Sequence, residues 1–268
     1  MDELLKHPAT LGLLAGIITW LFTSVGAAAV FLRRQFSRRT LDALLGFAAG
    51  VMLAASMWSL LLPALELAGE TWGKLGSLVP VALGFLAGAI SLRLLDILMP
   101  HLHPLMNQEE GLGACRMHRH VLLILAITLH NIPEALAVGV AFGATAIDPE
   151  LGIASAVILM LGIGLQNIPE GMAVSIPLLR EGCTRRRAFF YGQLSGLVEP
   201  VAALAGALLA SVALSVLPWA LSFAAGAMIF VTVEEVIPEA NASGNGNSAT
   251  MGAMLGFICM MCMDVAFG

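Results

Sequence analysis

The sequence has 268 residues, of which 59% are hydrophobic and only 12% are charged, and its formal net charge is −5. Soluble globular domains average about 45–50% apolar and about 25% charged residues, so this composition excludes an ordinary soluble protein. The sequence also lacks a basic patch interleaved with aromatic residues, which argues against nucleic acid as a partner. We therefore expect an integral protein of the lipid bilayer.

A helix that spans the hydrocarbon core needs roughly 20 apolar residues, and the chain has room for eight such helices. We predict spans at 8–32, 41–65, 77–99, 120–145, 151–179, 187–213, 216–238 and 248–267. Glycines four residues apart recur along them, which indicates close helix packing (Gly46/Gly50, Gly84/Gly88, Gly139/Gly143 and Gly192/Gly196). The predicted fold is all-α, with residues 1–268 forming a single transmembrane domain.

The basic residues predict the orientation of the chain. They gather after the first, third and fifth spans, whereas Lys6 and Lys74 fall on the other side. By the positive-inside rule the odd-numbered loops are cytoplasmic and both termini lie outside. The acidic start, with Asp2 and Glu3 before a long apolar run, is unlike a cleaved signal peptide. We expect a multi-pass protein of the plasma membrane, which in a bacterium is the inner membrane.

The second span carries Met52 on a helical stripe with Ser56 and Ser59. Taken alone, Met52 is interpreted as packing, because methionines commonly fill gaps between helices. The longest polar insertion, 101–120, contains four histidines. It is either a weak metal-binding loop or a solvated linker.

The fourth span contains His130, Asn131, Pro133 and Glu134 in an apolar run. The spacings of three and four residues place imidazole, amide and carboxylate on one helix face. Pro133 cannot donate to the carbonyl of Leu129, so the turn is disturbed at bilayer depth, which is tolerated only beside protein or water. Ionisable groups at this depth are costly, which indicates a functional site.

The fifth span repeats the pattern with Gln166, Asn167, Pro169 and Glu170. The fourth and fifth spans are antiparallel neighbours joined by a short connection, so the two copies can face each other at one depth. This is the geometry of inverted repeats with a site near the midplane, and we predict a 3+2+3 arrangement of the eight helices.

The sixth span adds Glu199, again beside a proline, which here follows the glutamate. Three carboxylates in one pocket of low dielectric repel one another, and a divalent cation resolves that conflict. Imidazole favours Zn, Fe, Ni or Cu, and carboxylate and amide oxygens broaden the choice to harder ions. The alternative is an interhelical hydrogen-bond network that only fixes packing. Cys259 and Cys262 in the last span form either a packing contact or a metal or redox pair.

At these residues the chain resembles the ZIP family of divalent-metal transporters, especially its bacterial GufA-like branch. His130-Asn131-Ile132-Pro133-Glu134 and Gln166-Asn167-Ile168-Pro169-Glu170-Gly171 are similar to the family's paired motifs. The segments 192–200 and 234–239 resemble its sixth and seventh helices. Ala135 stands where the motif has Gly, Gln166 where His is commoner, and Asn167 where some relatives carry Asp.

The resemblance implies a binuclear centre. One ion would take His130, Glu134, Gln166 and Glu170 with Met52 nearby. The other would use Asn131, Asn167 and Glu199, with Glu134 and Glu170 bridging. It further implies an entrance near Glu66 and Asp264 and a cytoplasmic exit lined by Asp96, His101, Glu234 and Glu235. For Glu66, Glu234 and Glu235, an ordinary solvated carboxylate is the alternative.

The resemblance also implies a homodimer with an elevator-like motion, in which helices 1, 4, 5 and 6 move past helices 2, 3, 7 and 8. We therefore predict an importer of Zn²⁺, with Fe²⁺, Cd²⁺ or Mn²⁺ as further substrates. The metal is cargo rather than cofactor, and up to two ions are expected. The rivals are a membrane metal sensor or storage protein, and a metal-dependent enzyme. An enzyme would need a general base outside the ligand set, and none is evident in the sequence.

Overall fold

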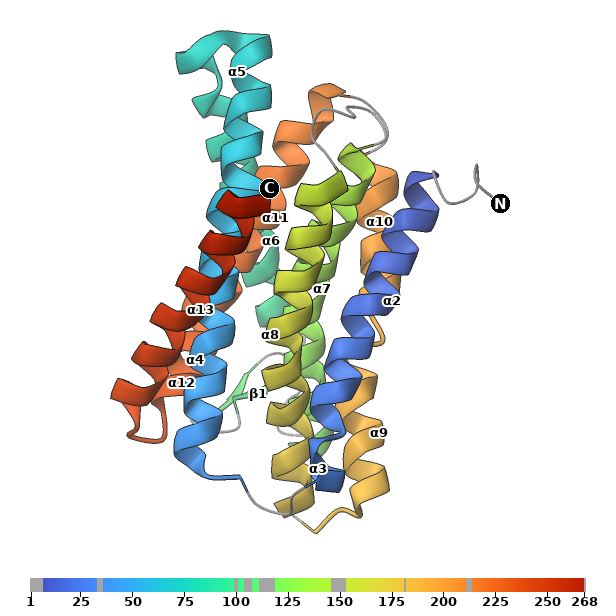
Figure 1. Cartoon of the computed structure of the whole chain (residues 1–268), viewed down its shortest axis with the longest axis vertical. Coiled ribbons are helices and arrows are strands. Elements are labelled where there is room, and N and C mark those ends of the chain that lie inside the picture. Colours follow the sequence, from blue (N-terminus) through green and yellow to red (C-terminus); the bar gives the residue numbers. More distant parts are fainter. Residues whose placement is uncertain are drawn as a thin grey trace.

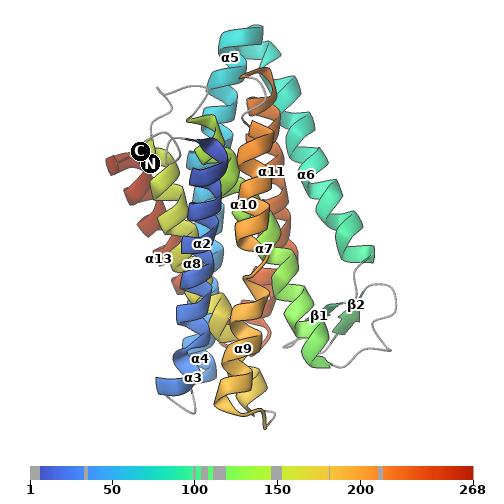
Figure 2. The same ribbon diagram turned by 90° about the vertical axis from the view of Figure 1, so that its right-hand side faces the viewer.

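The computed structural model describes residues 7–32, 36–98, 101–103, 108–110, 119–145, 153–180, 182–210 and 214–267. Within these ranges the chain forms a bundle of long helices (Figures 1 and 2). Its elements are α2 (Pro8–Ala27), α3 (Ala29–Leu32), α4 (Arg38–Ala55), η1 (Ser56–Leu61), α5 (Leu62–Gly76), α6 (Leu78–Leu98), β1 (His101–His103), β2 (Gln108–Glu110), α7 (Arg119–Ala144), α8 (Ile153–Arg180), α9 (Arg185–Ser195), α10 (Glu199–Ala210), η4 (Leu214–Val216), α11 (Leu217–Val231), η5 (Thr232–Val236), α12 (Ile237–Asn241) and α13 (Gly246–Phe267).

Eight helices in the described part of the chain are long and apolar enough to cross a membrane, which confirms the predicted number of spans. The helix bounds agree with the prediction to within a few residues, except that the second helix continues from Arg38 to a break at Gly73, whose φ is 72°, rather than ending near residue 65. At a rise of 1.5 Å per residue, the stretch before this break spans about 52 Å, more than a bilayer core of about 30 Å. Figure 1 shows α5 extending beyond the other helices at one end.

The helix contacts divide the bundle into two groups. The first group contains α2, α7, α8, α9 and α10, and its closest pairs are α10 with α7 and α2 with α8. The second contains α4, α5, α6, α11, α12 and α13, and its closest pairs are α13 with α4 and α11 with α6. The groups meet mainly where α4 passes α8 and α11 passes α7.

The predicted close packing at glycines is present inside both groups. A Cβ atom on Gly139 would overlap the carbonyl oxygen of Ala203, and one on Gly46 would overlap that of Ala249. Where an added Cβ would meet the backbone of another described helix, that helix belongs to the same group. Gly162 lies at the junction of the groups, and its Cβ would meet only side chains, those of Met260 and Val51.

Two π-helical turns interrupt the second group, and a proline follows each of them. In η1 the N–H of Leu62 donates to the carbonyl of Met57, and in η5 the N–H of Ile237 donates to that of Thr232. The next residues, Pro63 and Pro238, have no N–H and would clash with a carbonyl four residues back in a regular helix. The wider turn accommodates the ring, and such turns often occur at functional sites.

The prolines of the first group have a different effect. Both α7 and α8 continue through Pro133 and Pro169. The sixth span instead breaks between Ser195, where α9 ends, and Glu199, where α10 begins. In the insertion 101–120, the described residues include a small antiparallel hairpin that pairs His101 with Glu110, which the all-helical prediction did not include.

Candidate metal site

The two repeated motifs meet between α7 and α8. The side-chain amide of Gln166 donates to Oε1 of Glu134 at 2.6 Å. Glu134 and Gln166 are completely buried, and Glu170 is 3% exposed. The structure therefore joins the two antiparallel copies directly, at a position closed to bulk solvent.

Several buried side-chain oxygens in this region have no hydrogen-bond partner. Glu170 has two such oxygens, and Glu134, Gln166, Asn131 and Asn167 have one each. The NH₂ groups of all three amides are occupied as donors, so only their carbonyl oxygens remain. A buried acceptor without a donor is costly, and a cation satisfies several at once.

The negative charges of the region also favour a cation as partner. Glu134 lies close enough to Glu170 and Glu199 for both negative charges to act on it. His130 provides a favourable interaction with Glu170. Carboxylates crowded in a low dielectric attract a divalent cation strongly.

Glu199 is the carboxylate with both oxygens engaged. The hydroxyl of Thr23 donates to its Oε1 at 2.7 Å, and the amide of Asn167 donates to its Oε2 at 2.8 Å. Thr19, one turn earlier on α2, also lies close to Glu199, and its hydroxyl donates to the carbonyl of Gly16 at 3.1 Å. The sequence analysis did not include Thr19 and Thr23, although two buried threonines four residues apart form a polar stripe on the first span.

Asn131 supports the break in the sixth span. Its amide donates to the carbonyl of Ser195, the last residue of α9, at 3.1 Å. The indole of Trp20 donates to the carbonyl of Gln193 at 2.9 Å. Side chains from α7 and α2 thus satisfy carbonyls that the interrupted helix leaves free, which membrane depth requires.

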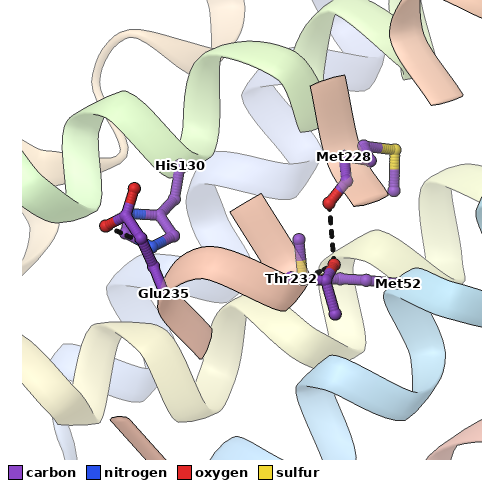
Figure 3. A network of polar contacts seen from close by, with 5 residues as sticks. All are labelled: Met52, His130, Met228, Thr232 and Glu235. Atoms are coloured by element: carbon purple, nitrogen blue, oxygen red, sulfur yellow. Dashed lines mark hydrogen bonds and ion pairs between the residues drawn. The ribbon is translucent and has the colours of Figure 1, made fainter. Parts of the chain in front are cut away.

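The two softest predicted ligands contact η5 (Figure 3). Nε2 of His130 lies 3.0 Å from a carboxylate oxygen of Glu235. The hydroxyl of Thr232 lies 3.5 Å from the sulfur of Met52 and 2.7 Å from the carbonyl of Met228. Glu235 is 5% exposed, so it is not an ordinary solvated carboxylate.

The predicted entrance and exit residues lie in varied surroundings. Glu66 is exposed on α5, and half-buried Asp264 accepts a hydrogen bond from Ser59. Exposed Glu234 lies 3.7 Å from Arg93. The side chains of two further predicted exit residues, Asp96 and His101, lie outside the described residues.

Among the side chains that the structure describes, no three of the His, Cys, Asp and Glu type form a group that could hold a metal ion by themselves. As the structure places them, His130, Glu134 and Glu170 do not form such a group, and the amide oxygens are further unpartnered acceptors between the motifs. Cys259 and Cys262 are free thiols on α13.

Comparison with known proteins gives consistent matches. The pattern of the ZIP Zinc transporter family matches residues 107–264. Zinc transporter GufA of Myxococcus xanthus is 41% identical over 96% of this chain and 99% of its own length. Zinc transporter ZIP11 of Bos taurus is 43% identical over 97% of this chain and 98% of its own, and zinc transporter ZIPB of Bordetella bronchiseptica is 41% identical over 95% and 81%.

Proposed function

Because the chain belongs to the ZIP zinc transporter family, we propose that it carries Zn²⁺ across a membrane into the cytoplasm. The observation that supports this most directly is the set of unpartnered buried oxygens on the two facing motifs. The relatives are named as zinc transporters, not enzymes, and Zn²⁺ is accordingly cargo, not a cofactor. The eight apolar helices make the chain a multi-pass membrane protein.

The first ion binds between α7 and α8. Glu134 and Glu170 supply charge, Gln166 supplies its carbonyl oxygen, and His130 and Met52 supply softer donors. The carboxylates replace water molecules of the incoming ion. Because these buried carboxylates are not surrounded by water, their attraction for a divalent ion exceeds that for a monovalent one by more than it would in solution. The same set also accepts Fe²⁺, Cd²⁺ and Mn²⁺, with the oxygens best suited to Mn²⁺ and the softer donors to Cd²⁺.

A second ion uses the carbonyl oxygens of Asn131 and Asn167, with Glu134 and Glu170 bridging. Glu199 contributes its charge, and it must release Thr23 or Asn167 before it can bind the ion directly, since both its oxygens are engaged. The donors that this position does not share with the first are two neutral carbonyl oxygens and a carboxylate that is already engaged. We expect it to bind more weakly.

Transport occurs as the first group of helices, which carries the motifs, slides past the second. The packing supports this division, since the backbone-to-backbone contacts at glycines lie within each group. At Gly162, contact between the groups is made by the flexible side chain of Met260. Interdigitated backbones resist sliding, whereas a side-chain interface permits it. The second group would also form the interface of a homodimer and remain fixed in the membrane, which in a bacterium is the inner membrane.

The test is radiolabelled Zn²⁺ uptake into sealed proteoliposomes. We expect saturable uptake by the wild type and loss of at least about tenfold in Glu134→Gln, since one charged ligand is removed while the shape is kept. Glu70→Gln, an exposed carboxylate of α5, is the matched control and should transport normally. Zn²⁺ binding without flux in the wild type would instead indicate a sensor or storage protein.

A further inference from the structure

The hydroxyl of Thr232 lies beside the sulfur of Met52, on the side of the second helix group. Both residues are completely buried. The distance between Thr232 Oγ1 and Met52 Sδ is 3.5 Å, which is within hydrogen-bond range for sulfur. Met52 is therefore not simply a gap-filling side chain, because a polar atom contacts its sulfur.

The geometry of Thr232 makes it a rigid support. Its hydroxyl has one proton and two acceptors beside it, the carbonyl of Met228 one turn earlier at 2.7 Å and the sulfur of Met52 at 3.5 Å, so the O–H can be directed to either. The branched Cβ and the contact with the preceding turn restrict the side-chain rotamer of Thr232. A methionine has three rotatable bonds, so a fixed contact at the sulfur limits the orientations that the thioether can adopt.

The same π-helical segment contacts both soft donors of the proposed site. Glu235, three residues after Thr232, lies 3.0 Å from His130. Figure 3 shows the two contacts arising from one stretch of η5. The oxygen donors of the site, in contrast, come from α7 and α8.

We propose that Thr232 is a positioning residue that fixes the Met52 thioether and thereby raises the carrier's preference for soft divalent cations over hard ones. Thioether sulfur favours soft metals, while carboxylate and carbonyl oxygens suit ions such as Mn²⁺. The inference rests on the proposed transport function and deepens it, since it assigns part of the metal preference to a residue that does not touch the metal.

The experiment compares Cd²⁺ and Mn²⁺ uptake, each as Vmax/KM, in proteoliposomes containing the full chain. Thr232→Val keeps the shape of the side chain and removes the hydroxyl. Thr232→Ser keeps the hydroxyl. We expect the Cd²⁺/Mn²⁺ ratio to fall about two- to tenfold in Thr232→Val, mainly through a higher KM for Cd²⁺, and to stay near the wild-type value in Thr232→Ser.

A double-mutant cycle separates positioning through Met52 from a general packing effect. Met52→Leu should lower the ratio at least as much, and Thr232→Val should add nothing in the Met52→Leu background. An unchanged or higher ratio in Thr232→Val, or an equal further fall in the double variant, would overturn the inference. Wild-type protein without Zn²⁺ uptake would refute the proposed function instead, and Cd²⁺ affinity of the purified variants would then decide the role of Thr232 separately.

Discussion

Nε2 of His130 lies 3.0 Å from the carboxylate of Glu235, and this contact joins the two helix groups. His130 belongs to α7 of the first group, and Glu235 belongs to η5 of the second. The hydrogen bonds of Thr232 and Ser59, in contrast, stay within the second group. A sliding motion of the first group must therefore break or remake the pairing of His130 with Glu235.

Glu235→Ala should lower the thermal stability of the purified protein in detergent. The substitution removes a buried polar contact of His130, and the loss of such a contact costs about 1–3 kcal/mol. Glu234→Ala is the matched control, because Glu234 is exposed and its contact with Arg93 is worth about 0–1 kcal/mol. Equal changes in melting temperature for the two variants would contradict a structural role for the pair.

Thr23→Val should destabilise the protein and weaken Zn²⁺ uptake, while Thr23→Ser should resemble the wild type. The hydroxyl of Thr23 donates to Glu199 at 2.7 Å, and a hydrogen bond to a charged group contributes about 1.5–3 kcal/mol. Valine keeps the shape, so the difference between the variants reports on the hydroxyl alone. Both unfolding in detergent and uptake in proteoliposomes should be measured, and identical behaviour of the two variants would contradict this role.

Gly139→Ala should be costly, and Gly162→Ala should be mild. The first methyl group would overlap the backbone oxygen of Ala203, and overpacking costs about 1–3 kcal/mol. The second would meet the side chain of Met260, which can rotate away. Gly69→Ala, with nothing within 4 Å, controls for the intrinsic gain of replacing a helical glycine. Melting temperatures that rank the variants otherwise would argue against backbone contact as the cause.

Gln166→His should raise Zn²⁺ affinity relative to Mn²⁺. An imidazole replaces a carbonyl oxygen at the first ion, and imidazole suits Zn²⁺ whereas oxygen ligands suit Mn²⁺. We expect the half-saturating Zn²⁺ concentration to fall and competition by Mn²⁺ to weaken, each by about two- to tenfold. Better competition by Mn²⁺ would show that Gln166 is not a ligand of the transported ion.

A cysteine at position 75 should react with a membrane-impermeant maleimide on intact cells. Leu75 is 82% exposed at the end of α5, on the predicted outer side. A cysteine in place of exposed Arg186, in a predicted cytoplasmic loop, should react only after the membrane is permeabilised. Both variants need a background without the four native cysteines. The reverse labelling pattern would invert the predicted orientation.

Much of the architecture could be predicted from the sequence because bilayer thickness restricts the possible elements. Apolar runs of the required length gave the eight spans, and the second is the one that extends well beyond its predicted end. The duplicated motif predicted that Glu134 and Gln166 would approach each other, since antiparallel neighbours bring equivalent positions to one depth. Glycine spacing predicted the close packing inside the helix pairs.

The remaining features depend on side-chain pairing between distant helices. Nothing in the sequence indicates that Thr23 contacts Glu199, since 176 residues separate them. The contact between Thr232 and Met52 could not be predicted from the sequence either, because both residue types are common inside membrane helices. The break of the sixth span after Ser195 was missed because a proline adjoins each of Glu134, Glu170 and Glu199, whereas of these three helices only that of Glu199 is interrupted.

The π-helical turn η5 makes the length of the seventh helix critical. A π-turn holds one more residue than an α-helical turn, and each residue rotates a helix by about 100°. Deleting one residue from this stretch would remove the wide turn, so that the ring of Pro238 would clash with a carbonyl four residues back and the relative directions of Thr232 and Glu235 would change. Single-residue insertions and deletions between Thr232 and Pro238 should therefore be far less tolerated than substitutions. The site depends on the number of residues in this turn as well as on their identity.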